Sequence, residues 1–342
     1  MKRIRFPAMT KARALVRILL QATVLGAAAH ASAAPSVIEG QDGWLFPGWE
    51  HTDAVNRATL DANLKTIEQT ATELAARHIG LVLMVVPAKA LFYPQRLPAG
   101  VAIAPPVKSR YDDILGMLKA AGVSTFDDRP VLRSVEHDQQ SAFYRADYHW
   151  SAWAAEASAD ATAQLIQARF PLPANGPGAT LGDWTNERRY GDLAMNFMAP
   201  EDRKRIGRDI YTVRKQPDDQ SGQSGQGGQQ DAGGALLDSA APQVQVIGNS
   251  FVQPYLGYTQ KLSNALGQPV GLTWNPGNVG PWKTFVDYVE TPAFAQHKPK
   301  VIVWQFNEAQ LENELDAASS WDAQSLMSTA SWRKRVGAAL AK

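Results

Sequence analysis

The chain has 342 residues, of which 45% are hydrophobic, so it is long enough to bury a sizeable core. Its formal net charge of +1 gives no general reason to expect a nucleic-acid partner. The absence of cysteine excludes disulfides, thiol catalysis and cysteine-based zinc sites. Because the histidines show no metal-ligand spacing such as H-E-x-x-H, we expect neither a metal nor a cofactor.

Residues 1–33 have the composition of a secretory signal peptide. Six basic residues precede or begin the apolar run 18–29, and Ala31-Ser32-Ala33 matches the A-x-A cleavage rule. The run is too short for an ordinary membrane span. We therefore predict cleavage after Ala33 and a periplasmic location; the alternative is an uncleaved N-terminal inner-membrane anchor. Cleavage removes six of the 34 basic residues and none of the 33 acidic ones, which leaves a mildly acidic chain.

Helices and strands alternate through the first half of the chain. Apolar residues at helical spacing predict a helix over 61–80, and the continuous apolar run 81–87 predicts a strand buried on both faces. A helix at 110–122, a short strand at 123–128 and a helix at 151–170 follow, the last with Ser151 as its N-cap. This alternation favours a parallel sheet with helices on both faces.

The pattern weakens from 171 to 234, where a Gly-, Gln- and Ser-rich stretch at about 216–234 predicts a flexible insertion. The periodic pattern then returns, with a strand, a helix and a strand predicted at 243–251, 284–295 and 299–308. Because sheet elements lie on both sides of the insertion, we predict one α/β domain over 34–342.

Three polar motifs follow predicted strands: "ADYHW", "GNS" and "QFNE". Because loops at the carboxyl ends of parallel strands meet in one crevice, we expect these motifs to converge. Ser250 is then the candidate nucleophile, since a serine hydroxyl needs an adjacent base. His149 is the candidate general base, and Asp147 would orient its imidazole. The amide groups of the serine turn would hold an oxyanion.

Each motif also has an ordinary structural explanation. Serines in G-x-S turns are commonly turn residues or helix caps, and D-x-H pairs are common at surfaces and caps. The second glycine of a G-x-S-x-G elbow is absent, which argues against a standard α/β-hydrolase. The two motifs at strand ends of one exported chain together favour the triad Asp147, His149 and Ser250.

The other histidines and the tryptophans near the motif have simpler explanations. His51 and His137 are expected to be solvated. Trp150 and Trp153 are more typical of packing than of a sugar platform, although an exposed tryptophan beside a reactive histidine would suit a carbohydrate.

Several stretches resemble the alginate O-acetyltransferase AlgJ/AlgX group, whose catalytic domain is SGNH-hydrolase-like. The stretches are "GQDGWLF" at 40–46, "VVPAKALFYPQRLP" at 85–98, "RADYHWS" at 145–151, "RRYGDLA" at 188–194, "VIGNSF" at 246–251 and "PKVIVWQFNEAQL" at 299–311. Their order and spacing, more than any one of them, carry the likeness. About thirty residues follow the last strand, too few for the C-terminal carbohydrate-binding module of the AlgX branch, so the chain is nearer the AlgJ branch.

The resemblance implies a flavodoxin-like, SGNH-hydrolase-like sheet. In ordinary SGNH enzymes the serine precedes D-x-H, so the reversed order here implies a circularly permuted fold. The turn reads G-N-S where G-D-S is usual, and "QFNE" replaces G-x-N-D, which leaves the family's oxyanion asparagine unassigned. The expected substrate-binding residues are Trp150, Lys89, Tyr93, Asn249 and Asn307.

The resemblance and the triad together predict an exported polysaccharide O-acetyltransferase that uses an acetyl-serine intermediate in alginate-like exopolysaccharide modification. A periplasmic carbohydrate acetylesterase would use the same triad with water as acceptor. A non-catalytic polysaccharide-binding assembly protein would keep the fold with an inactive site. The predicted partners are a polysaccharide acceptor and, by family resemblance, a membrane acyl-donor protein.

Overall fold

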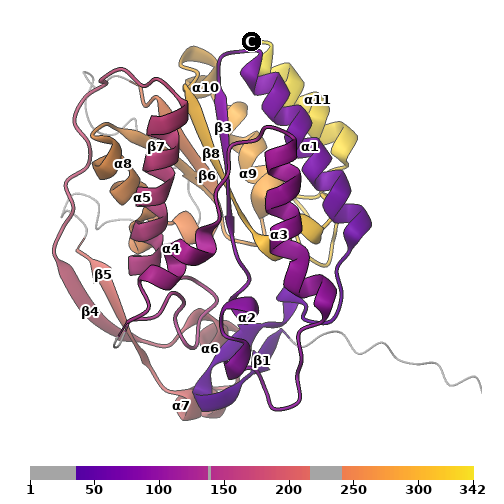
Figure 1. The fold of residues 1–342 in the computed structure, drawn as a ribbon, viewed down its shortest axis with the longest axis vertical. Helices are drawn as coiled ribbons and strands as arrows, with labels where there is room; N and C mark the ends of the chain where they lie inside the picture. Colours follow the sequence, from indigo (N-terminus) through magenta and orange to yellow (C-terminus); the bar gives the residue numbers. More distant parts are fainter. Residues whose placement is uncertain (1–35, 138–139, 216–240) are drawn as a thin grey trace, which may run out of the picture. The chain divides into compact units, whose positions relative to one another are not determined.

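The computed structural model of the protein describes residues 36–137, 140–215 and 241–342 (Figure 1). The predicted signal peptide at 1–33 and the predicted insertion at 216–234 lie outside the described residues. Within the described ranges, no helix combines the length and the apolar character needed to span a membrane.

A four-stranded parallel sheet carries the site. Its order is β3-β8-β6-β7, and the strands are β3 (Gly80–Val86), β8 (Val301–Asn307), β6 (Val244–Gly248) and β7 (Val270–Trp274). β3 and β8 are almost continuous apolar runs because both of their faces are buried. Beyond β3, Ser124 makes one parallel bridge to Val82.

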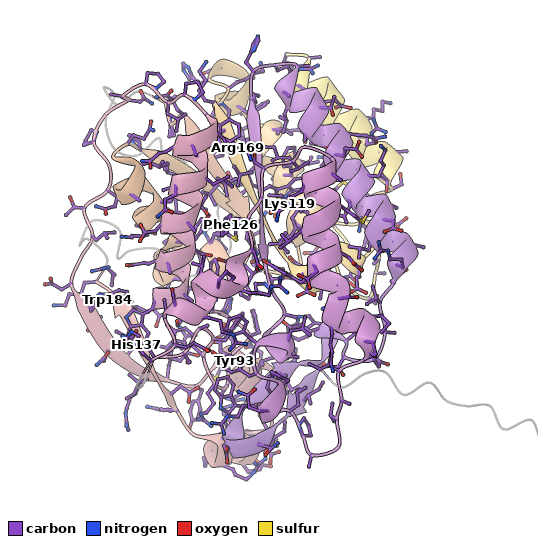
Figure 2. All side chains as sticks on the ribbon, viewed as in Figure 1. Tyr93, Lys119, Phe126, His137, Arg169 and Trp184 are labelled. Atoms are coloured by element: carbon purple, nitrogen blue, oxygen red, sulfur yellow. The ribbon has the colours of Figure 1, made fainter. Side chains whose placement is uncertain are left out.

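Helices cover both faces of this sheet, as the alternation of elements predicted (Figure 1). Successive side chains of β3 point to opposite faces. Val82 and Met84 pack with residues of α5 (Ala152–Arg169) and α8 (Tyr258–Leu266). Leu81 and Leu83 pack in the opposite core, with helices α1 (Arg57–Ala75), α3 (Pro105–Ala120), α9 (Gly280–Val289) and α11 (Thr329–Leu340). Figure 2 shows the side chains that fill these layers.

The three helices predicted in the first half of the chain are confirmed as α1, α3 and α5, with shifted ends. α1 begins at Arg57 because the Asn56 side chain accepts a hydrogen bond from the Thr59 N–H at 3.3 Å. α5 begins after Ser151, whose side chain accepts from Ala154 N–H, as the sequence predicted.

Two predicted elements differ from the structure. The strand predicted at 123–128 is reduced to the bridge at Ser124, because the chain turns there into α4 (Asp128–Ser134), which Asp127 caps. The helix predicted at 284–295 is divided between α9 and α10 (Pro292–Gln296). Proline has no N–H to continue a helix and is favoured in a first turn, so it starts a new one.

An antiparallel hairpin lies outside the main sheet, in the region where the sequence pattern weakens (Figure 1). It consists of β4 (Trp184–Arg189) and β5 (Asp209–Arg214), with α6 (Asp192–Phe197) and α7 (Pro200–Ile206) between them. The remaining short strands and α-helix of the described residues are β1 (Val37–Glu39), β2 (Leu45–Pro47) and α2 (Lys89–Phe92).

Candidate active site

The structure brings Asp147, His149 and Ser250 together, although 101 positions separate the histidine from the serine. His149 Nε2 lies 2.8 Å from Ser250 Oγ, and His149 Nδ1 lies 2.8 Å from Asp147 Oδ1. Ser250 follows β6, whereas the other two lie in the loop before α5. The predicted contact is confirmed, and the catalytic roles stay a prediction.

The serine turn is held by the neighbouring strand β8. The Oε1 of Gln305, a fully buried residue on β8, accepts the N–H of Asn249 at 3.0 Å. Asn249 Oδ1 in turn accepts the N–H of Phe251 at 2.9 Å. At Gly248 a Cβ atom would lie 2.8 Å from Gln305 Oε1, so only glycine permits this close packing. The contacts with β8 therefore fix the turn that carries Ser250.

The loop that carries Asp147 is held by a buried lysine. Lys89 Nζ lies 2.7–2.8 Å from four backbone carbonyl oxygens, those of Leu45, Tyr144, Arg145 and Asp147. Burial lowers the pKa of Lys89 to about 7, while attraction to Asp147 opposes the shift. A compact ammonium group with several donors suits such a ring of carbonyls.

The Asp147 carboxylate is buried and fully hydrogen-bonded. Oδ1 accepts from the His149 ring and backbone N–H, and Oδ2 accepts from the Tyr211 hydroxyl at 2.7 Å and the Asp192 N–H at 3.1 Å. Burial alone would raise the pKa of Asp147. Attraction to His149 and the hydrogen bonds from His149 and Tyr211 outweigh that effect and hold the pKa well below its usual value.

A second carboxylate faces the same imidazole. Asp192 Oδ2 lies 3.5 Å from His149 Nδ1, and its Oδ1 accepts from Arg189 at 2.8 Å. Burial, together with repulsion from Asp147, raises the pKa of Asp192. The Arg189 guanidinium lies 5.0 Å from the centre of the Tyr211 ring. The hairpin and α6 thus supply an outer layer around the Asp–His pair.

Sequence reasoning missed these supporting residues. Tyr211 and Arg189 lie on strands that were not predicted, and "GDL" was noted only as a family motif. The one sequence feature that relates to this contact is Gly191. In the structure a Cβ atom at this position would lie 2.2 Å from the carbonyl oxygen of Ala146. Glycine here allows the backbone to reach Asp147 and places Asp192 beside the imidazole.

Aromatic rings enclose the imidazole. The centre of the Tyr148 ring lies 4.1 Å from that of His149, and Phe251 lies 5.0 Å away. Trp49, 41% exposed, packs edge-on against Tyr148. Ser250 itself is 9% exposed, so most of its surface is covered by protein.

Four of the five expected substrate contacts are corrected by the structure. Trp150 is fully buried, and its Nε1 donates to a backbone carbonyl at 2.9 Å, so it packs against the serine turn. Lys89 is fully buried in its ring of carbonyls. The Tyr93 hydroxyl accepts the Ala142 N–H at 2.9 Å. Asn249 is buried and engaged in the turn. These side chains position the site and do not face a polysaccharide.

Asn307, the fifth expected contact, is half-buried at the end of β8. Its Oδ1 accepts from the amides of Asn249 at 3.1 Å and Gln305 at 2.7 Å. A substrate contact by Asn307 stays a prediction.

One group of described side chains has the spacing of a metal site. The ligand atoms of Asp147, His149 and Asp192 all lie within 4.8 Å of one another. The hydrogen bonds already described use the same atoms, with His149 Nδ1 donating to Asp147 Oδ1 in the tautomer that leaves Nε2 free to accept from Ser250. The triad network therefore accounts for the cluster without a metal.

Residues 37–308 match the family model described as SGNH hydrolase-like domain, acetyltransferase AlgX. The chain belongs to this family. The prediction of an SGNH-hydrolase-like fold and of an acetyltransferase is therefore confirmed at the level of the family, and the match extends over most of the described chain.

Curated relatives support the AlgJ branch. The "Probable alginate O-acetylase AlgJ" of Pseudomonas aeruginosa is 29% identical over 85% of this chain and 75% of that protein. The protein of the same name from Pseudomonas fluorescens is 28% identical over 85% of this chain and 73% of its own length. The "Alginate biosynthesis protein AlgX" of Azotobacter vinelandii matches half of this chain at 24% identity and a third of its own length (34%).

Solved structures agree on the fold. The O-acetyltransferase domain of Pseudomonas putida AlgJ superposes with a TM-score of 0.69 at 24% identity, covering 88% of this chain and 99% of that domain. Pseudomonas aeruginosa AlgX superposes with a TM-score of 0.57 at 18% identity, covering 79% of this chain and 62% of AlgX.

Proposed function

We propose that the protein is an exported alginate O-acetyltransferase that works through an acetyl-serine intermediate on Ser250. The observation that carries this proposal is the unbroken chain of hydrogen bonds from Ser250 through His149 to Asp147. The family supports acetyl transfer, and the AlgJ relatives support alginate as the acceptor.

In the first step His149 Nε2 takes the proton of Ser250 Oγ while that oxygen attacks the acetyl carbonyl carbon of the donor. The tetrahedral intermediate collapses when its bond to the leaving group breaks and His149 returns the proton to that group. The products are acetyl-Ser250 and the protonated leaving group, so the proton balance closes.

In the second step His149 takes the proton of a sugar hydroxyl, and the hydroxyl oxygen attacks the acetyl-serine carbonyl. The bond to Ser250 Oγ breaks, and the serine recovers the proton from His149. The sugar leaves as its acetyl ester and the enzyme is restored. Asp147 holds the imidazole in the tautomer that keeps Nε2 available and stabilises the imidazolium.

The oxyanion of both steps would be held by the serine turn. Of the three N–H groups of residues 249–251, those of Asn249 and Phe251 already donate to Gln305 and to the Asn249 side chain. Within this turn the N–H of Ser250 is therefore the donor that we assign to the oxyanion.

The test supplies a small acetyl ester as donor and deacetylated alginate as acceptor, and measures acetylated polymer by NMR. The wild-type protein is expected to form polymer ester, and Ser250→Ala is expected to form none. Release of free acetate with no polymer ester would instead identify an acetylesterase. Equal acceptor-binding by both proteins with no turnover by either would identify a polysaccharide-binding assembly protein.

The proposal includes export and domain organisation. Cleavage after Ala33 would leave one catalytic domain over 34–342 with a dispensable insertion at about 216–234, in the periplasm or on an uncleaved inner-membrane anchor. Mass spectrometry of the N-terminus of the exported protein tests the cleavage site. Delivery of acetyl groups by a membrane acyl-donor partner belongs to the same proposal, and co-purification from membranes tests it.

We also propose that the fold is circularly permuted, and the strand order supports this. Numbered in chain order from the serine strand, β6, β7, β8, β3 and the Ser124 segment become strands 1 to 5. Their order in the sheet, from β7 to Ser124, is then the flavodoxin-like 2-1-3-4-5. A chain whose ends are joined and which is reopened before β6 should fold and keep its ester-cleaving activity.

A further inference from the structure

The β4–β5 hairpin has two chemically different faces. On one face Tyr211 supports Asp147, and Glu187 accepts from the Tyr255 hydroxyl at 3.1 Å. Because successive side chains of a strand alternate, Trp184 and Asn186 project from the other face of β4. That face borders a cavity of about 550 Å³, within the range of small-molecule sites.

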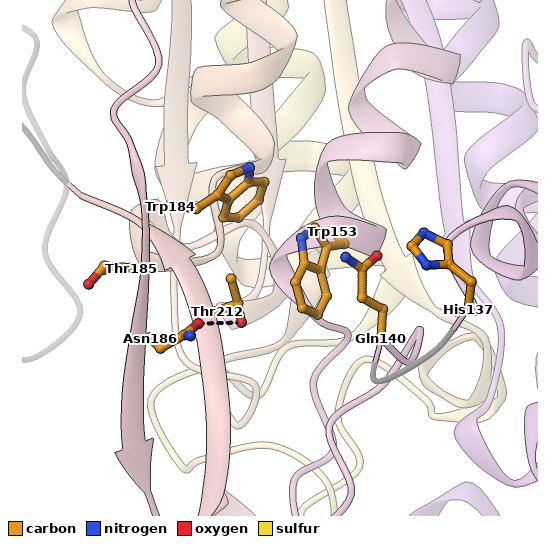
Figure 3. A pocket seen from close by; sticks show the side chains of 7 residues that line it. All are labelled: His137, Gln140, Trp153, Trp184, Thr185, Asn186 and Thr212. Atoms are coloured by element: carbon orange, nitrogen blue, oxygen red, sulfur yellow. Dashed lines mark hydrogen bonds between the residues drawn. The ribbon is translucent and has the colours of Figure 1, made fainter.

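The cavity combines two indole rings with uncharged hydrogen-bonding groups (Figure 3). Trp184 from the hairpin and Trp153 from α5 have ring centres 6.0 Å apart. Figure 3 shows Asn186 and Thr212 on the hairpin side and Gln140 beside Trp153. Thr212 Oγ1 donates to Asn186 Oδ1 at 2.7 Å, which holds the two polar side chains together on the hairpin.

The Trp184 ring is held in place by its neighbours. The Arg214 guanidinium lies 4.1 Å from the centre of its ring, and Arg214 is itself held by two hydrogen bonds to Glu156 of α5, at 2.7 and 3.0 Å. The ring is therefore braced from one side while 36% of the residue remains exposed. A braced aromatic ring loses little freedom when a ligand stacks on it.

We propose that this cavity binds sugar rings of the acceptor polysaccharide at a distance from the triad, an inference that rests on the proposed function. A pyranose presents a face of C–H groups that packs on indole, and a rim of hydroxyls that pairs with amide and hydroxyl side chains. Among the described residues that line the cavity, none carries a carboxylate.

The separation of the two sites predicts dependence on polymer length. β4 runs from Trp184 to Arg189, which at about 3.3 Å per residue spans roughly 16 Å. A long acceptor can occupy both sites at once, whereas a disaccharide is too short to do so and a small acetyl ester needs only the triad. Loss of the cavity should therefore raise KM for polymer and leave small substrates unaffected.

The experiment compares Trp184→Ala and Trp153→Ala with Ile210→Ala, a control on the same hairpin that is 50% exposed and does not line the cavity. Affinity electrophoresis in deacetylated alginate and in a neutral β-glucan measures binding, and a small acetyl ester measures the triad. We expect Trp184→Ala to weaken polymer binding by about five- to tenfold with ester cleavage unchanged. Trp184→Phe should retain most of the binding, and Ile210→Ala all of it.

The outcomes separate the two proposals. If folded Trp184→Ala and Trp153→Ala bind both polymers as the wild type does, or if the wild type binds neither, the cavity inference is overturned. If the wild type transfers no acetyl group yet loses polymer affinity on Trp184→Ala, the proposed function fails and the cavity inference stands. Melting curves identify any variant that has unfolded; Trp184 is the more exposed ring, so its variants remain informative if Trp153→Ala does not fold.

Discussion

Asp147 and Asp128 are equally buried, each with 1% of its surface exposed, yet their environments drive ionisation in opposite directions. Hydrogen bonds from Tyr211 and His149, with the attraction of the imidazole, hold the pKa of Asp147 well below its usual value. Asp128 accepts a hydrogen bond from Ser158, but burial raises its pKa to about 7.

The difference between the two aspartates shows that hydrogen-bond donors and nearby charges, and not the depth of burial, decide whether a buried carboxylate is charged. Among the described residues, Asp128 Oδ2 has no hydrogen-bond partner. By contrast, each carboxylate oxygen of Asp147 accepts two hydrogen bonds. A charged Asp147 can stabilise an imidazolium, whereas a charged Asp128 costs folding free energy.

The largest loss of activity is expected when the nucleophile of the triad is removed. Ser250→Ala should lower kcat for a small acetyl ester by about 10⁶-fold, because base and orienting carboxylate have no nucleophile to act on. The melting temperature should stay near that of the wild type, since Ser250→Ala only replaces one hydroxyl with a hydrogen atom. Steady-state kinetics and a melting curve check both statements.

Asp147→Asn tests the charge at the same position. The asparagine keeps the size of the side chain but favours the wrong imidazole tautomer, so kcat should fall by about 10⁴-fold with the fold intact. Activity near wild type in a correctly folded Asp147→Asn would show that the carboxylate has no role in catalysis.

Asp128→Asn changes an aspartate that is buried as deeply as Asp147 but lies outside the triad. We expect kcat to stay unchanged and the stability of the fold to rise in a pH-dependent way. The folded pKa of about 7 lies above the unfolded value of about 4, so the wild-type protein loses stability as pH rises between them. The variant lacks this loss. Unfolding by urea should show Asp128→Asn more stable by about 1–3 kcal/mol at pH 8 and little different at pH 4. A larger gain at pH 4 than at pH 8 would contradict the assigned charge.

Asp192→Asn is expected to have the smallest effect. Removing a negative charge 3.5 Å from His149 Nδ1 weakens the electrostatic stabilisation of the imidazolium that forms during the reaction. The rate near neutral pH should change by less than about tenfold, because Asp147 remains. Steady-state kinetics with a small acetyl ester measure the change, and a fall as large as that of Asp147→Asn would contradict this secondary role.

The main sheet and the triad could be predicted from the sequence because their signals are local. The apolar runs of β3 and β8 mark strands buried on both faces, and G-N-S lies at the end of β6, whereas D-x-H lies in the loop between α4 and α5. β4 escaped prediction because most of its side chains are exposed, so it has no apolar alternation. The contact of Tyr211 with Asp147 was missed with the hairpin, since 64 positions of chain separate the two residues.

Sequence patterns also failed to separate buried from exposed side chains of the same type. Trp150 and Trp153 stand three residues apart beside His149, and nothing in the local sequence distinguishes them. The structure buries Trp150 completely and places Trp153 at the edge of a cavity. Which ring packs in the core and which borders the cavity depends on the hairpin that contributes Trp184.

If Ser250 carries the acetyl group during transfer, the acetyl-enzyme can be trapped. The protein is incubated with a small activated acetyl ester, quenched in acid, digested, and its peptides are analysed by mass spectrometry. We expect one acetylated peptide, with the acetyl group on Ser250, absent from Ser250→Ala and lost when an acceptor sugar is added before the quench. An acetyl group carried on another residue, or ester turnover by Ser250→Ala at the wild-type rate, would contradict it.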